Sequence, residues 1–270
     1  MKVEITNKEI TIQWNGVYYF ALSDYPNISP WELKKLITFM DYEKRHGRET
    51  EISCENESIL TAVNTVIENP KRVENATLPT KITECTYCKQ NGCLTDFTCH
   101  TATMGASKKI LKIGKLLSAV KAFNKSGIEL VKDSRNAAGD PPDYFEYIMF
   151  TWGNCTAGYR LVMERNLGRN PTDDELENKL VPGIRFYFKY NDIIKHSGYV
   201  FDGYHPVKIK DELILSDYLY ACIIPHEYKD EFEQLIPLNI ANKVHYIPHG
   251  GQGLRDWSNT VYEYICTLQV

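Results

Sequence analysis

Four cysteines and a histidine lie within one short stretch of the chain, CTYCKQNGCLTDFTCH. They are Cys85, Cys88, Cys93, Cys99 and His100. A Cys-x-x-Cys pair places two thiolates on one tight turn and forms half of a tetrahedral zinc site, which further thiolates or an imidazole would complete. The other half lacks this spacing, because five residues separate Cys93 from Cys99. The pattern leaves two alternatives: a structural zinc site with no open position for water, or free cysteines at a turn between two domains.

His100 also begins a second pattern, in which small polar residues precede a basic amphipathic segment. Thr101 and Thr103 follow the histidine, and apolar residues then recur at helical spacing over residues 110–117, with lysines on the opposite side. Gly114 keeps the predicted helix short. The lysines would suit a nucleic-acid backbone or simply form a solvated face. A histidine at the end of a strand is either a ligand contact or a satisfied polar group.

The order of these residues resembles the opening of ADP-ribosyltransferase folds, which read His-x-Thr, a helix, then Ile-Leu-x-x-Gly-x-Leu. The matching positions are His100, Thr101, Thr103, Ile110, Leu111, Gly114 and Leu116. Over residues 95–270 the order of elements resembles the DNA-targeting members, the DarT type. The resembling segments are an aromatic strand, turn and further strand (143–165), a strand, helix and hairpin (182–206), a late core strand and acidic segment (216–236), and closing strands around a glycine-rich loop (243–270).

The resemblance implies an enzyme that uses NAD as substrate and transfers ADP-ribose to a macromolecular acceptor, either a nucleic acid or a protein. Cleavage of the nicotinamide–ribose bond passes through an oxocarbenium-like state. The enzyme must therefore grip the dinucleotide, stack on nicotinamide and stabilise positive charge. By resemblance, His100 hydrogen-bonds a ribose hydroxyl with Thr101 and Thr103 beside it, and Tyr144 or Tyr147 stacks on nicotinamide.

The catalytic carboxylate differs from the family's pattern. The family has Glu at the start of its late core strand, whereas the nearest acid in this sequence is Asp217, whose side chain is shorter. Asp217 is the predicted catalytic carboxylate, and its alternative role is that of a strand-edge or helix-cap residue. If the register shifts toward Ala221, no acid is present and the protein would bind without catalysing. Arg135 precedes the aromatic strand and is the candidate for the pyrophosphate, which guanidinium groups bind in bidentate fashion.

Composition and missing motifs limit the other possibilities. The chain has 270 residues, is 43% hydrophobic and 24% charged, and carries a net charge of -4, which predicts a globular protein rather than a passive coat for nucleic acid. No apolar leader and no run of about 18 apolar residues are present, so we expect a cytoplasmic protein without a membrane partner. Dinucleotide-binding, P-loop, zinc-protease and serine-hydrolase signatures are also missing from the sequence.

The elements that must position these residues predict an α+β fold in three segments. Residues 1–78 form a small α+β domain, residues 79–98 a cysteine-rich junction, and residues 99–270 a domain with a mixed or antiparallel sheet. The predicted features of the first domain are antiparallel strands around turns at Asn7-Lys8 and Asn15-Gly16, a helix from Ser29-Pro30 to Gly47, and a second helix over residues 58–68.

A second function from a different class fits the same composition. The chain could be a non-enzymatic interaction module, stapled by zinc, whose 18 tyrosines make binding surfaces. The two functions predict different arrangements of side chains. An enzyme should gather His100, an aromatic residue and a carboxylate around one cleft, whereas an interaction module should scatter them.

Overall fold

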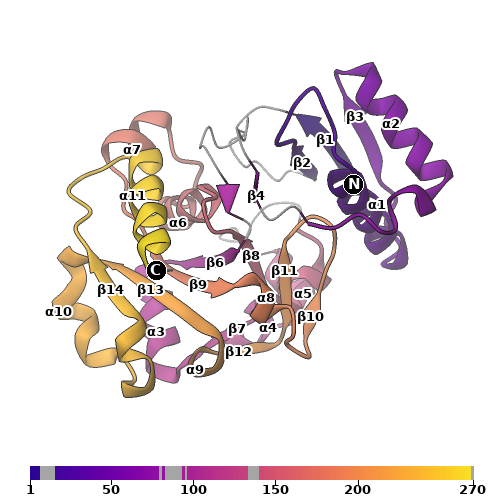
Figure 1. Ribbon diagram of the computed structural model, residues 1–270. Coiled ribbons are helices and arrows are strands. Elements are labelled where there is room, and N and C mark those ends of the chain that lie inside the picture. Colours follow the sequence, from indigo (N-terminus) through magenta and orange to yellow (C-terminus); the bar gives the residue numbers. More distant parts are fainter. Residues whose placement is uncertain (7–15, 79–80, 83–92, 95, 133–139, 269–270) are drawn as a thin grey trace. The chain divides into compact units, whose positions relative to one another are not determined.

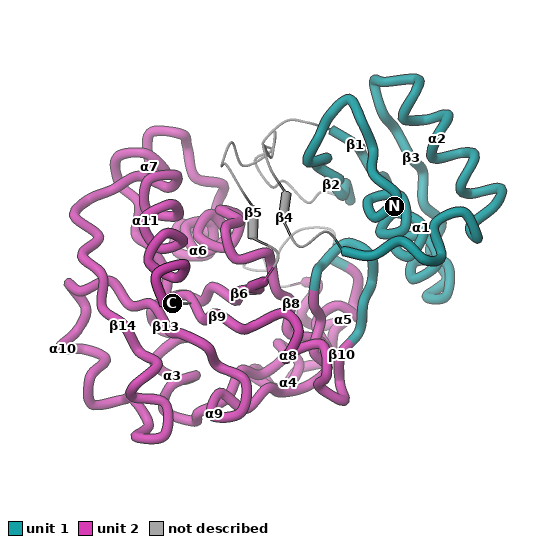
Figure 2. Tube along the Cα trace, in the orientation of Figure 1, with its two compact units in different colours: residues 1–95, 137–140, 200–206 teal, residues 96–136, 141–199, 207–270 magenta. Residues whose placement is uncertain are grey.

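The computed structural model describes residues 1–6, 16–78, 81–82, 93–94, 96–132 and 140–268. Helices accompany a mixed sheet of seven strands and several small sheets, which confirms the predicted α+β fold (Figure 1). The chain divides into two compact units (Figure 2). Unit 1 comprises residues 1–95, 137–140 and 200–206, and unit 2 comprises residues 96–136, 141–199 and 207–270.

Unit 1 contains a small parallel sheet and two helices. Its elements are β1 (Lys2–Thr6), β2 (Val17–Ala21), α1 (Pro30–Arg45), β3 (Glu51–Cys54), α2 (Glu57–Glu68), η1 (Pro70–Val73), β4 (Lys81–Ile82) and β5 (Cys93–Leu94). The strand order is β2-β1-β3 with both pairs parallel, so the described sheet is parallel where an antiparallel one was expected. The predicted hairpins pair both β1 and β2 with residues 9–14, which lie outside the described residues, so these hairpins stay predictions. Alternation of polar and apolar residues determines which face a side chain takes, but not the direction of the neighbouring strand. The predicted turn residues Asn7, Lys8 and Asn15 lie outside the described residues.

Both helices predicted for this part of the chain are confirmed, and side-chain caps explain where they begin. Ser29 Oγ accepts a hydrogen bond from the Glu32 amide at 3.2 Å, while the Glu32 carboxylate accepts one from the Ser29 amide at 2.8 Å. Pro30 occupies the first position of α1, where its missing N–H costs nothing. Asn56 caps α2 by accepting a hydrogen bond from the Ser58 amide at 2.9 Å.

A late segment, residues 200–206, completes unit 1. The ring of Tyr204 lies 5.0 Å from that of Tyr18 in β2 and 5.8 Å from that of Phe39 in α1, measured between ring centroids. Gly203 has a φ of +82°, and a Cβ at this position would overlap the Phe39 amide nitrogen. Only glycine allows the chain to pass α1 this closely. The aromatic core of unit 1 therefore depends on residues far along the sequence.

Unit 2 is built on the seven-stranded sheet, whose order is β10-β11-β8-β6-β9-β13-β14. The strands are β6 (Phe97–Ala102), β8 (Tyr147–Trp152), β9 (Ile184–Lys189), β10 (Tyr199–Val200), β11 (Val207–Lys210), β13 (Leu219–Pro225) and β14 (Val244–Ile247). β6 pairs antiparallel with β8 and β9, whereas β13 pairs antiparallel with β9 and parallel with β14. β7 (Lys115–Leu117) and β12 (Glu212–Ile214) form a separate antiparallel ribbon.

Helices and 3-10 turns connect these strands. The helices are α3 (Met104–Ile113), α4 (Ala119–Phe123), α5 (Gly127–Val131), α6 (Ala157–Leu167), α7 (Asp173–Asn178), α8 (Tyr190–Ile193), α9 (Leu215–Tyr218), α10 (Lys229–Phe232) and α11 (Leu254–Thr267). The turns are η2 (Pro142–Glu146), η3 (His226–Tyr228), η4 (Glu233–Leu235) and η5 (Leu238–Lys243). No helix in the described parts of the chain combines the length and apolar character needed to cross a membrane.

Two of these helices replace predicted strands, and one confirms a prediction. α3 ends at Gly114, which adopts the left-handed conformation with a φ of 67°, as the short predicted helix requires. α6 and α11 occupy segments where the sequence predicts strands, so those predictions are wrong. In α11 the buried residues include Trp257, Val261 and Ile265, which recur every four residues and so belong to one helix face.

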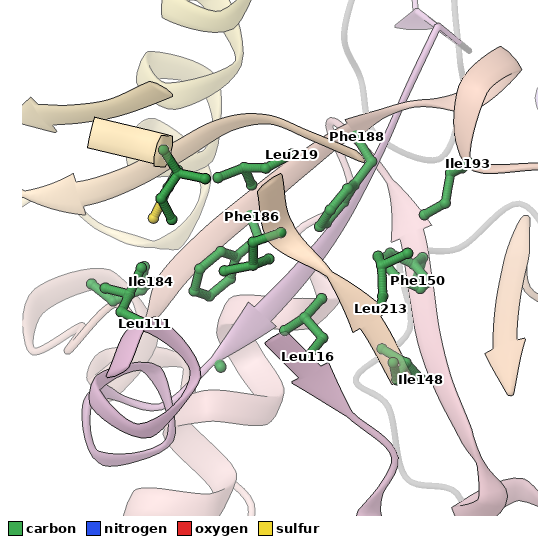
Figure 3. Close-up of a cluster of buried hydrophobic side chains, with 14 of the residues drawn as sticks. Leu111, Leu116, Ile148, Phe150, Ile184, Phe186, Phe188, Ile193, Leu213 and Leu219 are labelled. Carbon is green, nitrogen blue, oxygen red and sulfur yellow. The ribbon is translucent and has the colours of Figure 1, made fainter. Parts of the chain in front are cut away.

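The sheet of unit 2 separates two hydrophobic clusters. Side chains alternate along β9, so Phe186 and Phe188 join one cluster, together with Phe150 and Leu111 (Figure 3). Tyr187 lies on the opposite face, in a cluster to which α6 and α11 contribute. Both faces of the sheet are therefore covered by apolar side chains.

Candidate active site

A cleft of about 780 Å³ opens in unit 2 where β9 ends and β13 begins. We call it the Asp217 cleft. It is lined by Lys189, Asp192, Lys195, Asp217, Tyr218, Leu219, Tyr220, Asn242, Lys243, His245 and Leu268. It is a shallow depression that is largely open to solvent. The lining combines cations, carboxylates and aromatic rings, which suits a ligand with both charged and ring-shaped parts.

Three lysines contribute positive charge to the Asp217 cleft, and they differ in their partners. Lys195 forms an exposed ion pair with Asp192, with Nζ 3.1 Å from the carboxylate. Lys189 Nζ lies 5.1 Å from the centroid of the Tyr220 ring, and Lys243 Nζ lies 3.4 Å from a backbone carbonyl. Within the described residues, neither Lys189 nor Lys243 has an ion-pair partner. Their ammonium groups are therefore available to an anionic ligand.

Asp217 lies on the single turn α9, which is held in place by buried neighbours. Leu215 and Leu219, at either side of the turn, are buried in the first cluster. The Asp217 side chain itself is exposed, and its carboxylate accepts a hydrogen bond from Ser216 Oγ at 2.7 Å. Among the described residues no cation forms a salt bridge with it. The fold thus anchors the backbone of Asp217 and leaves its carboxylate open to the cleft.

His245 supplies an imidazole to the same cleft from β14. Its Nδ1 lies 2.9 Å from Tyr264 Oη, and the two rings meet edge to face with their centroids 5.5 Å apart. Partial burial lowers the pKa of His245 below its ordinary value of 6.5. The imidazole is therefore uncharged at neutral pH and can exchange a proton with a ligand.

His100 is half-buried in β6 and is held by one hydrogen bond. Its Nδ1 lies 3.0 Å from the Met149 carbonyl oxygen, and because a carbonyl only accepts, Nδ1 carries the hydrogen and donates it. Burial lowers the pKa of His100 to about 4, so the ring is neutral at pH 7. Nε2 then has a lone pair, and within the described part of the chain nothing hydrogen-bonds to it. Such an acceptor suits a hydroxyl group.

The structure does not bring His100 and Asp217 together. His100 pairs with Phe186 across β6 and β9, whereas Leu219 pairs with Phe188, and Asp217 lies two residues before Leu219. With about 3.3 Å per strand residue and about 4.8 Å between strands, the two side chains lie on the order of 15 Å apart. His100 does not line the Asp217 cleft. The two predicted catalytic residues occupy different places in unit 2.

Thr101 and Thr103 have structural partners. Thr101 Oγ1 accepts a hydrogen bond from Nε of Arg185 at 3.0 Å. Arg185 is fully buried, and its guanidinium lies 3.7 Å from the centroid of the Tyr159 ring. Thr103 caps α3 by accepting a hydrogen bond from the Ala106 amide at 3.3 Å. Contacts of these threonines with NAD stay predictions and would compete with the bonds seen here.

The two predicted nicotinamide-stacking tyrosines both face a buried lysine. Lys208 Nζ lies 3.6 Å from the ring centroid of Tyr144 and 4.6 Å from that of Tyr147. Tyr144 and Lys208 are completely buried, and Tyr147 is half-buried. Neither tyrosine lines the Asp217 cleft. Their aromatic faces stabilise an ammonium group of the protein itself.

The metal site stays a prediction, and so does the pyrophosphate contact. Three of the predicted residues lie outside the described residues: Arg135, Cys85 and Cys88. Cys93 belongs to β5, and Cys99 is buried in β6 with its Sγ 3.3 Å from Thr151 Oγ1. In the part of the chain that the structure describes, no three Cys, His, Asp or Glu side chains are placed to hold a metal ion.

Sequence reasoning missed the other polar residues of the Asp217 cleft. Lys189 ends β9, Lys243 directly precedes β14, and His245 lies within β14. The only sequence signal that could have indicated Lys189 and Lys243 is a charged residue beside an apolar strand. Their meeting at one edge depends on the order β9-β13-β14, which no local pattern predicts.

Comparisons of the chain with models of protein families, with curated proteins and with solved structures found no match in any of the three.

Proposed function

We propose that this protein is an NAD-dependent ADP-ribosyltransferase that binds NAD in the Asp217 cleft and modifies a macromolecular acceptor. One observation carries the proposal: a carboxylate, aromatic rings and two lysines without an ion-pair partner among the described residues line a single cleft of about 780 Å³. These are the groups that NAD and its cleavage require. The resemblance of the sequence to ADP-ribosyltransferases suggests the reaction, but of the site residues that it implies only Asp217 lines this cleft.

Three parts of NAD have a matching group in the cleft: the pyrophosphate, the nicotinamide and the ribose that joins them. Lys189 and Lys243 provide the positive charge for the pyrophosphate, since no ion pair among the described residues neutralises them. Tyr218 and Tyr220 provide aromatic surface for the nicotinamide. Asp217 provides negative charge where the ribose becomes cationic as nicotinamide leaves. The proposal assigns His100 no contact inside this cleft.

The scattering of other predicted site residues favours a second candidate. His100 lies outside the Asp217 cleft, and Tyr144 is completely buried against Lys208. Scattered side chains are expected of a non-enzymatic interaction module whose tyrosine-rich surface binds a partner. This candidate predicts neither NAD binding nor release of nicotinamide, so one assay separates the two functions.

The deciding experiment measures nicotinamide release from NAD by the purified full-length protein, alone and with cell lysate as a source of acceptor. We expect Asp217→Asn to lower the rate by about 100-fold or more, because the carboxylate acts only on the charged transition state. Asp230→Asn, which changes an exposed acid outside the cleft lining, is the matched control and should keep the wild-type rate. Lys243→Ala should weaken NAD binding by about 10-fold or more. A wild-type protein that neither binds NAD nor releases nicotinamide would leave the interaction module as the function.

A further inference from the structure

We infer that His245 is the group that removes the proton from the acceptor when the acceptor attacks the ribose of NAD. The inference rests on the proposed function and adds to it a second catalytic residue. It starts from a difference between Asp217 and His245, which both line the Asp217 cleft. Asp217 is an exposed carboxylate, whereas His245 is a half-buried imidazole with one hydrogen-bonding partner among the described residues.

The surroundings of His245 favour a neutral base. Tyr264 of α11 holds Nδ1 at 2.9 Å, and no carboxylate hydrogen-bonds to the ring among the described residues. Besides Tyr264 of α11, the charged and titratable groups that line the cleft with His245 are Tyr220 of β13, Lys243 of η5, Asp217 and Tyr218 of α9, Lys189 of β9, Asp192 of α8 and Lys195 in the turn after it. Burial lowers the pKa of His245, so it accepts a proton without first losing one at neutral pH.

Tyr264 also orients the proposed base. The inference requires the tautomer in which Nδ1–H donates to Tyr264 Oη, because the lone pair of His245 is then on Nε2, the ring nitrogen that no described residue binds. A hydroxyl of the acceptor, or a water molecule in its place, can then donate its proton to Nε2. Tyr264 is a positioning residue in this arrangement, because it acts only through the imidazole.

The proposed step balances in atoms and charge. A lone pair of the acceptor oxygen forms the new bond to C1′ of the ribose, and the electron pair of the C1′–N bond moves to the pyridinium nitrogen, which leaves as neutral nicotinamide. The acceptor O–H proton moves to Nε2 of His245. Without this base an uncaptured ribosyl cation recombines with nicotinamide, so net release of nicotinamide slows.

The test uses the full-length protein with NAD as the probe and water as the acceptor. We expect His245→Ala to lower nicotinamide release by about 100-fold while the Kd for NAD stays within about twofold, because general bases contribute roughly 10²–10⁴ in rate. Sodium azide attacks C1′ without losing a proton, so it should restore release in His245→Ala and yield ADP-ribosyl azide. His226→Ala, an exposed histidine outside the cleft lining, is the matched control and should behave as the wild type.

A second variant covers the case in which His245→Ala does not fold. Tyr264→Phe keeps the imidazole and removes its partner, and we expect a loss of about 10-fold, together with a shift of the acid limb in the pH profile. Release by His245→Ala close to the wild-type rate, no rescue by azide, or an unchanged profile in Tyr264→Phe would each overturn the inference and leave the proposed function standing. A wild-type protein that does not bind or cleave NAD would overturn both.

Discussion

Burial sets the charge of two histidines in unit 2. His100 has a pKa of about 4, and the pKa of His245 is also lowered, so both rings are neutral at pH 7. A neutral imidazole has one donor and one acceptor nitrogen, and in each case one nitrogen already has a partner in the protein. The other ring nitrogen, Nε2, has no hydrogen-bond partner among the described residues in either histidine.

The depressed pKa of His100 predicts a pH dependence of stability. In the unfolded chain this pKa returns to about 6.5, so between pH 6.5 and pH 4 the unfolded chain binds a proton that the folded chain does not. The free energy of unfolding therefore falls as the pH falls through this window. The difference between the two pKa values corresponds to about 3 kcal/mol at most, which partial exposure reduces.

Chemical denaturation at pH 4–8 should show a shallower pH dependence for His100→Gln than for the wild type. Equal slopes would contradict the prediction.

At the scale of elements, a glycine sets the distance between α6 and β6. A Cβ at Gly158, in the first turn of α6, would overlap Thr101 Oγ1 in β6. Thr101 in turn accepts the hydrogen bond from the buried Arg185. The helix therefore packs against the strand at a distance that only glycine permits, and the Thr101–Arg185 bond depends on it.

Two glycine-to-alanine variants test this packing. Gly158→Ala should lower the free energy of unfolding by about 1–3 kcal/mol, because helix and strand must separate. Gly105→Ala is the matched control, since Gly105 also lies in the first turn of a helix and its Cβ would meet no atom within 4 Å. The control should be neutral or gain up to about 1 kcal/mol from the higher helix propensity of alanine. Thermal or chemical unfolding of both variants gives the comparison, and equal effects would exclude the proposed contact.

Helices that are bounded by their own capping residues could be predicted from the sequence. The direction and order of the strands could not, because they depend on which segments pair. Ser29 and Gly114 mark helix ends through their own caps and backbone conformation, so α1 and α3 follow from residues close in sequence. The direction of β2 against β1 and the order of β9, β13 and β14 depend on distant segments. Trp257, Val261 and Ile265 did contain a helical signal for α11 that the prediction of a strand overlooked.

The residues of the candidate site also fall into those that could be predicted from the sequence and those that could not. Asp217 was singled out through the resemblance, as the acid nearest the start of the late core strand, and it lies two residues before β13 in the lining of a cleft. Lys189, Lys243 and His245 come from other strands or turns, and only the sheet order brings them to that cleft. Their spacing in the sequence has no relation to their spacing in the fold, so no motif could have predicted them.

At the scale of the whole molecule, residues 200–206 belong to unit 1 although unit 2 surrounds them in the sequence. We expect Tyr204→Ala to loosen unit 1 selectively, because its ring packs against Tyr18 and Phe39. Hydrogen exchange should become at least about 10-fold faster in β1 and α1 and stay unchanged in β6 and β9. Phe123→Ala removes a 54% exposed ring and is the control that should change neither set of amides. Faster exchange in β6 and β9 after Tyr204→Ala would contradict this prediction.

The late origin of this segment also affects synthesis of the protein on the ribosome. Residues 1–78 contain most of the strands and helices of unit 1 and leave the exit tunnel first. Tyr204, which packs against Tyr18 and Phe39, is translated on the order of a hundred residues later. At about 5–20 residues per second, this interval lasts on the order of ten seconds. During that time the nascent N-terminal unit presents an incomplete aromatic core to chaperones and to neighbouring chains. Unit 1 can therefore be completed only after residues 200–206 have left the exit tunnel.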